Sequence, residues 1–262
     1  MAEGYGVAAE TTTERALAFM KFAGLNGMFY VASQNAFIGR IGHQKTMSLA
    51  CFGNIVSFAI IFLWQLKSSV ILAGDDAFSV KIGMDENMTY FNLLQQFVLM
   101  AVSYMGWVSS GSELPSMPKI LSTDHAYFIS HVHDFWMWFF GILSFFATDM
   151  LLENYKVSTE SASDGELAFM MELMKFMGML LIGNGIRAEM VRQGGNTDCA
   201  YAANRIAVMY YCLSLGASIF QSASVKHDFG TTAEDWMAPR IFDFLRNFGM
   251  MYWAVSVMTK ND

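Results

Sequence analysis

Seven stretches of mostly apolar residues alternate with short polar stretches along the chain. They cover residues 16–38, 47–66, 90–109, 127–150, 167–186, 204–222 and 241–258. A helix of about 20 apolar residues is long enough to cross the hydrocarbon core of a bilayer. The pattern therefore predicts an all-α integral membrane protein, a helical bundle of about seven transmembrane helices.

The distribution of apolar residues around these helices indicates that they are surrounded by lipid and do not pack on the core of a water-soluble protein. Residues 47–66 are apolar on every side of the helix that they would form, whereas a helix packed on a soluble core is polar on its outer face. Inside a bilayer each backbone N–H and C=O must be paired within the protein, and a helix does this within one segment. The chain contains only 3 prolines, which agrees with helices that have few interior breaks.

The same pattern divides the chain into three parts. Residues 1–15 form a polar amino-terminal segment, residues 16–258 a seven-span transmembrane domain, and residues 259–262 a polar tail. The amino-terminal segment is acidic and polar, which is not typical of a signal or transit peptide. No polar stretch between the spans is long enough to fold as a second domain, so any activity is expected within the bundle.

Composition and charge agree with this class and exclude others. The chain is 54% hydrophobic and 15% charged, against about a quarter charged residues in soluble domains. Its net charge of −7 includes no basic run, so we expect no nucleic-acid partner. Cations in short loops, Arg40, Lys45, Arg187 and Arg192, favour the cytoplasmic side for those loops. That places the amino terminus on the non-cytoplasmic side.

The odd-numbered spans share a short pattern of apolar residues around a long polar side chain. It is seen at residues 19–25, 93–99, 173–179 and 244–250. Similarity at a fixed period indicates a repeated unit. The bundle can thus be interpreted as three helical hairpins plus a closing helix, with glycines such as Gly24, Gly178 and Gly249 allowing close helix contact.

Polar side chains inside the spans are the candidate functional residues, because ionisable groups in hydrocarbon are costly and usually face the bundle interior or a water path. The densest group is His131, His133 and Asp134. Two histidines at i and i+2 point to nearly opposite sides of a helix, so we predict no metal site from this pair. We predict no cofactor. The alternative is ligation of a pigment or haem by His131 or His133, but a haem with two histidine ligands would need a second buried histidine on another span, and the sequence offers none.

The other candidates lie on three different spans. Gln95 and Gln96 fall on the third span, Glu172 and Lys175 on the fifth, and Asp243 and Arg246 on the seventh. The two charged pairs have i, i+3 spacing and can neutralise each other along one helix face. They are therefore interpreted either as structural ion pairs or as parts of a substrate or ion path.

No motif of a known catalytic site occurs in the chain, so no catalytic residue is predicted. We predict a small channel- or transporter-like bundle in contact with the lipid bilayer, with other membrane subunits or further copies of the chain as partners. The alternative is a non-catalytic membrane subunit of a larger energy-transducing complex, respiratory or photosynthetic, that holds partners, lipids or pigments. A continuous polar cavity that crosses the bundle and is lined by Gln95, Gln96, Glu172 and His131 would favour transport, whereas a dry core with wide apolar flanks would favour the subunit.

Overall fold

The computed structural model describes residues 44–116, 125–154 and 162–194, together with isolated positions before residue 25 and after residue 244. Within this part of the chain every regular element is a helix, and the all-α prediction is confirmed. The predicted spans at 16–38, 204–222 and 241–258 lie almost entirely outside the described residues.

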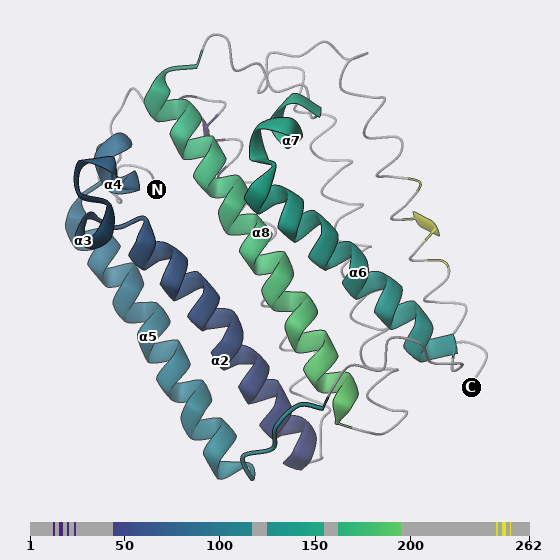
Figure 1. Cartoon of the computed structure of the whole chain (residues 1–262). Coiled ribbons are helices and arrows are strands. Elements are labelled where there is room, and N and C mark those ends of the chain that lie inside the picture. The colour runs from purple at the N-terminus through teal and green to yellow at the C-terminus, as the bar shows by residue number, and fades with distance from the viewer. Residues whose placement is uncertain are drawn as a thin grey trace.

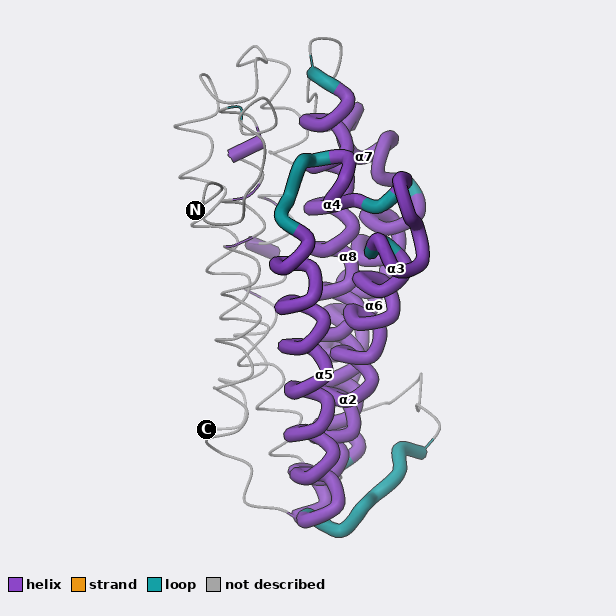
Figure 2. The backbone as a smooth tube through the Cα atoms, turned by 90° about the vertical axis from the view of Figure 1, so that its left-hand side faces the viewer, coloured by secondary structure: helices purple, strands orange, loops and turns teal. Residues whose placement is uncertain are grey.

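Four long helices form the framework of the described part. They are α2 (Gln44–Lys67), α5 (Glu86–Ser109), α6 (His125–Phe146) and α8 (Asp164–Gln193). They lie side by side in the order α5, α2, α8, α6, and each runs antiparallel to its neighbour (Figure 1). Figure 2 shows this layer from its side, with α5 nearest the viewer. The four helices correspond to the predicted spans at 47–66, 90–109, 127–150 and 167–186.

Only α2, among the described helices, is both long enough and apolar enough to cross a membrane. It has 24 residues and carries Lys67 in its last turn. The apolar run of α6, Phe135–Phe146, is shorter. α5 begins with the polar sequence Glu86-Asn87, and α8 carries charged residues along much of its length, which lowers their mean hydropathy.

The start of α5 is fixed by capping. The Asp85 carboxylate accepts a hydrogen bond from the backbone N–H of Asn87 at 2.9 Å, and Glu86 places a negative charge in the first turn. Both features stabilise a helix amino terminus. The helix ends at Ser109, where Gly111 takes a positive φ of 107° and the chain turns. The amino-terminal cap adds one turn before the predicted start at residue 90.

α8 is longer than predicted at both ends. Its cap is Ser163, whose Oγ accepts from the backbone N–H of Glu166 at 3.1 Å, in the spacing of a capping box. At the other end it continues to Gln193 instead of stopping at residue 186. The assignment of Arg187 and Arg192 to a loop is therefore wrong: both lie on α8 and are buried, so they no longer support the predicted orientation.

The segment between α2 and α5, expected as a short polar stretch between two spans, folds into three short helices. These are α3 (Val70–Ala73), the 3-10 helix η3 (Gly74–Asp76) and α4 (Phe78–Lys81). Gly74, with φ +56°, permits the turn between the first two. α4 packs against α8, so this connection covers one end of the layer (Figure 1).

α6 does not continue unbroken to residue 150. It ends at Phe146, and after Ala147 the chain enters α7 (Thr148–Asn154), whose Leu151 and Leu152 are buried. α6 packs closely on α8 where Gly141 faces Gly178: a Cβ added to Gly178 would lie 2.6 Å from the carbonyl oxygen of Gly141. This contact confirms the expectation for Gly178, whereas no described residue lies within 4 Å of such a Cβ at Gly24 or Gly249.

Candidate ligand-binding pocket

A pocket of about 370 Å³ lies at the end of the layer where α4 meets α2, α5 and α8. Polar and aromatic side chains share its lining: Trp64, Gln65, Ser68, Phe78, Ser79, Met84, Thr89, Asn92, Gln95, Gln96, Phe169, Glu172, Leu173 and Phe176. This volume falls within the range of pockets for small ligands. The pocket combines three of the sequence-predicted residues, Gln95, Gln96 and Glu172.

Helical spacing explains why these side chains converge. On α8 the lining positions are i, i+3, i+4 and i+7 from Phe169, which all lie on one helix face. On α5 they begin at Thr89 and recur at i+3, i+6 and i+7. α4 then adds Phe78 and Ser79 across the end, and the last turns of α2 supply the remaining wall.

Five buried oxygen atoms of this lining have no hydrogen-bond partner among the described residues. They are Gln65 Oε1, Ser79 Oγ, Thr89 Oγ1, Gln96 Oε1 and Glu172 Oε2. They are also all the unpartnered buried side-chain nitrogen and oxygen atoms that this part of the chain contains. A buried polar group without a partner costs about 1–3 kcal/mol, and native proteins hold few of them. Their gathering around one pocket indicates that something else completes them.

Glu172 is the single charged residue of the described lining. Its Oε1 atom accepts a hydrogen bond from Lys175 Nζ at 2.9 Å, and its side chain is 17% exposed. The predicted i, i+3 pair is thus formed, and Lys175 lies beside the pocket without lining it. Because Lys175 contacts only one carboxylate oxygen, Oε2 remains available to a further donor.

Aromatic rings form the apolar part of the walls. Phe78 of α4 stacks on Phe169 of α8, with ring centroids 6.4 Å apart and an interplanar angle of 6°. Trp64 of α2 and Phe176 of α8 also lie 6.4 Å apart, tilted by 32°. These ring pairs join α2 and α4 to α8 at the pocket and give its lining an aromatic as well as a polar character.

The other predicted residues are not among the described lining residues of the pocket. His131, His133 and Asp134 lie on α6, which contributes nothing to the described lining, and their side chains are outside the described residues. Asp243 and Arg246 lie outside the described residues altogether. Among the residues that the structure describes, no group of three or more His, Cys, Asp or Glu side chains could hold a metal ion.

Sequence reasoning missed Gln65, Ser79 and Thr89. Gln65 could have been found, because it is a polar residue near the end of an otherwise apolar predicted span. Ser79 and Thr89 carried no signal of their own, since both fell in a stretch assigned to a loop. Ser79 is only 1% exposed because α4 packs it inward.

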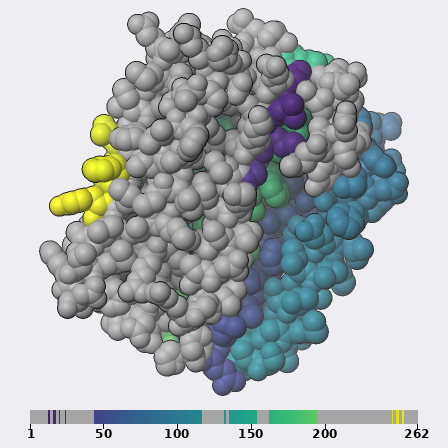
Figure 3. Space-filling model, turned by 180° about the vertical axis from the view of Figure 1, so that it is seen from behind, coloured from purple at the N-terminus to yellow at the C-terminus, as the bar shows by residue number. Residues whose placement is uncertain are grey.

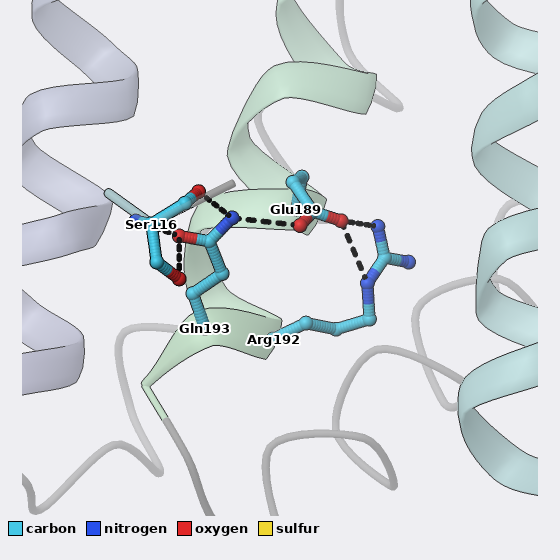
Figure 4. A network of polar contacts seen from close by, with 4 residues as sticks. All are labelled: Ser116, Glu189, Arg192 and Gln193. Carbon is cyan, nitrogen blue, oxygen red and sulfur yellow. Dashed lines mark hydrogen bonds and ion pairs between the residues drawn. The ribbon is translucent and has the colours of Figure 1, made fainter. Parts of the chain in front are cut away.

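A second polar cluster lies at the opposite end of α8. Figure 4 shows four of its residues, Ser116, Glu189, Arg192 and Gln193, which are linked to one another by hydrogen bonds and an ion pair. Glu189 forms an ion pair with Arg192 and accepts from Gln193 Nε2 at 2.8 Å. Gln193 also accepts from the backbone N–H of Ser116 at 2.8 Å, which ties the loop after α5 to α8. Nearby, the Arg187 guanidinium lies 5.2 Å from the centre of the Phe58 ring. These contacts attach the end of α8 to the loop after α5 and to α2.

Geometry and composition together define the class: an all-helical protein with one described helix capable of crossing a membrane and a partly polar pocket at one end of its helix layer. Comparisons of the chain with protein-family models, with curated proteins and with solved structures find no significant match. The pocket is therefore the feature of the described residues that bears on function.

Proposed function

We propose that the chain is a multi-pass membrane protein, a small channel- or transporter-like bundle that admits a small polar solute through the pocket between α2, α4, α5 and α8. The observation that carries this proposal is the pocket itself, in which Gln95, Gln96 and Glu172 come together with unpartnered buried oxygens. Intramembrane polar residues that face a common cavity are typical of solute paths.

The membrane part of the proposal is supported by α2 and by the surface of α5. Along α5 large apolar side chains stay exposed in the folded chain: Tyr90, Phe91, Leu94, Phe97, Val98, Val102, Tyr104, Met105 and Val108. Soluble proteins rarely expose such an extended apolar surface, and lipid is the environment that suits it. In Figure 3 the teal atoms of α5 form one edge of the molecule.

The test is solute flux in liposomes. Purified protein is reconstituted, and uptake is measured for small inorganic cations, organic amines, amino acids and organic anions against protein-free liposomes. At least one class should cross faster, and Gln96→Met should lower that flux about tenfold by removing a polar group from the path. No uptake of any class by protein that is folded by circular dichroism would contradict the proposal.

The alternative function, a non-catalytic subunit of a larger membrane complex, is favoured by the surface of α6. Phe135, Phe139 and Phe146 are exposed there, and Phe135 stacks on Phe139 with centroids 6.0 Å apart. Such a surface suits a membrane partner, a second copy of the chain or a flat pigment. Native mass spectrometry of a mild detergent extract distinguishes the two, because a subunit should be recovered with stoichiometric partners.

A further inference from the structure

We infer that the pocket is built for an organic ammonium ion: a primary amine, protonated at neutral pH, with an apolar or aromatic body. The inference rests on the proposed function and names the solute class of the same pocket. Three properties of the lining lead to it: the kind of missing hydrogen-bond partner, the sign of the charge, and the chemistry of the walls.

The unpartnered atoms require a donor. Gln65 Oε1, Gln96 Oε1 and Glu172 Oε2 can only accept hydrogen bonds, and the hydroxyls of Ser79 and Thr89 can accept as well. A simple carboxylate ligand such as benzoate has only acceptors to offer and would leave the first three unpaired. A primary ammonium group carries three N–H donors, which matches an excess of acceptors.

The charge of the lining favours a cation. Among the described lining residues Glu172 is the one charged side chain, and no Lys, Arg or His is present. Lys175 neutralises Glu172 through Oε1 alone, so an ammonium group can form a second charge-assisted hydrogen bond with Oε2. Among the described lining residues, an incoming anion would meet Glu172 and no cation to pair with.

The walls favour an organic cation over a metal ion. Metal cations such as Ca²⁺ take six to eight oxygen ligands at short range, and several carboxylates usually contribute. Here a single carboxylate is joined by the rings of Trp64, Phe78, Phe169 and Phe176 around about 370 Å³. Aromatic faces attract ammonium groups and also pack against an apolar body.

Benzylammonium is a suitable probe, with benzyl alcohol and benzoate as neutral and anionic analogues of the same shape. Binding is measured by isothermal titration calorimetry to the full chain in zwitterionic lipid nanodiscs, with empty nanodiscs subtracted. Benzylammonium should bind at least about tenfold more tightly than either analogue, the difference expected for a charge-assisted hydrogen bond in a partly buried site.

Two variants locate the site. Glu172→Gln should weaken benzylammonium binding about tenfold or more, since it removes the negative charge and leaves Lys175 uncompensated. Gln96→Met keeps the ion pair and should weaken binding several-fold. The matched controls, Glu86→Gln and Gln44→Met, change exposed residues outside the pocket and should leave the affinity unchanged.

The outcomes separate the inference from the proposed function. Equal or tighter binding of benzyl alcohol or benzoate, lost in Gln96→Met, would overturn the choice of an amine while supporting a solute pocket. Benzylammonium binding that neither pocket variant weakens would overturn the inference. If no probe binds the folded chain and no solute class crosses in the liposome assay, both proposals are wrong.

Discussion

At the scale of single residues, the pocket predicts a conflict between stability and binding. Thr89 Oγ1 is buried without a partner in the described part of the chain, and valine has almost the same shape without the hydroxyl. Because Thr89→Val removes an unsatisfied polar atom, the ligand-free protein should gain about 1 kcal/mol. Thermal unfolding followed by circular dichroism in detergent should show Tm rising by about 2–4 °C.

The same substitution at a satisfied threonine provides the control. Thr148 is buried, and its hydroxyl donates to the carbonyl oxygen of Ser144 at 2.8 Å. Thr148→Val should therefore lower stability by about 1 kcal/mol through loss of that hydrogen bond. A fall in Tm for both variants would show that the Thr89 hydroxyl has a hydrogen-bond partner in the folded protein. The pocket would then not lack hydrogen-bond donors for its oxygen atoms.

At this scale the sequence predicted the carboxylate of Glu172 and two of the amides, but it missed the amide of Gln65 and the hydroxyls. Gln95, Gln96 and Glu172 were selected because such groups are rare inside apolar spans, and they do share one pocket. Serine and threonine are common in membrane helices and carry no comparable signal. Ser79 becomes part of the site only because α4 folds back against α8, a tertiary contact that no local pattern encodes.

At the scale of elements, α6 and α8 approach each other closely at a pair of glycines, Gly141 and Gly178. In Gly178→Ala the new Cβ would lie 2.6 Å from the backbone oxygen of Gly141, and backbone cannot move aside as a flexible side chain can. The helices must separate, and we expect a loss of about 1–3 kcal/mol, the usual range for overpacking. Chemical or thermal denaturation in detergent measures it.

Gly24→Ala is the matched control, because no described residue lies within 4 Å of a Cβ built at that helical position. There the higher helix propensity of alanine should leave stability unchanged or raise it by up to about 1 kcal/mol. Similar losses for the two variants would mean that the effect is not caused by the contact with Gly141.

The exposed apolar face of α5 leads to a prediction about its surroundings. Val102 is 55% exposed and its neighbour Ser103 8% exposed, so the two point to different sides of one helix turn. In a cysteine-free background, a nitroxide at Val102→Cys should collide more often with oxygen than with a water-soluble nickel complex. At Ser103→Cys it should be shielded from both, and at Ser112→Cys the nickel complex should dominate. Higher nickel accessibility at Val102 would place α5 in water.

Helix existence was easier to predict than helix ends. The apolar stretches at 47–66, 90–109 and 167–186 all lie within observed helices, because a long apolar run leaves the backbone few alternatives. The ends differ because they depend on polar capping residues, such as Ser163 and Glu166, that the apolar pattern does not contain. The burial of Arg187 and Arg192 was missed for a related reason: charged residues suggested a loop, but α8 continues and pairs Arg192 with Glu189.

At the scale of the whole molecule, the middle of α8 carries no charged residue between Lys175 and Arg187. Glu172 and Glu189 are 17 positions apart (189−172), which corresponds to about 25 Å along a helix. That is close to the thickness of the hydrocarbon core, about 30 Å. Between them α8 contacts α2 mainly through apolar side chains such as Ile61, Met179 and Leu180. In a membrane this arrangement would place the pocket near one surface and the Glu189 cluster near the other.

If α2 and α5 both cross a membrane, their antiparallel order determines which residues share a membrane surface. Asp76 in η3 and Glu153 in α7 lie at the pocket end of the layer, whereas Ser112 lies in the loop at the opposite end (Figure 1). In sealed vesicles, a membrane-impermeant maleimide added outside should label Asp76→Cys and Glu153→Cys alike. Ser112→Cys should be labelled only after the vesicles are opened. If the protein is inserted in the opposite orientation, Ser112→Cys should be labelled from outside and the other two only after opening. Labelling of all three from one side would mean that α2, α5 and α6 do not cross the bilayer, and the exposed apolar face of α5 would then have to be covered by protein.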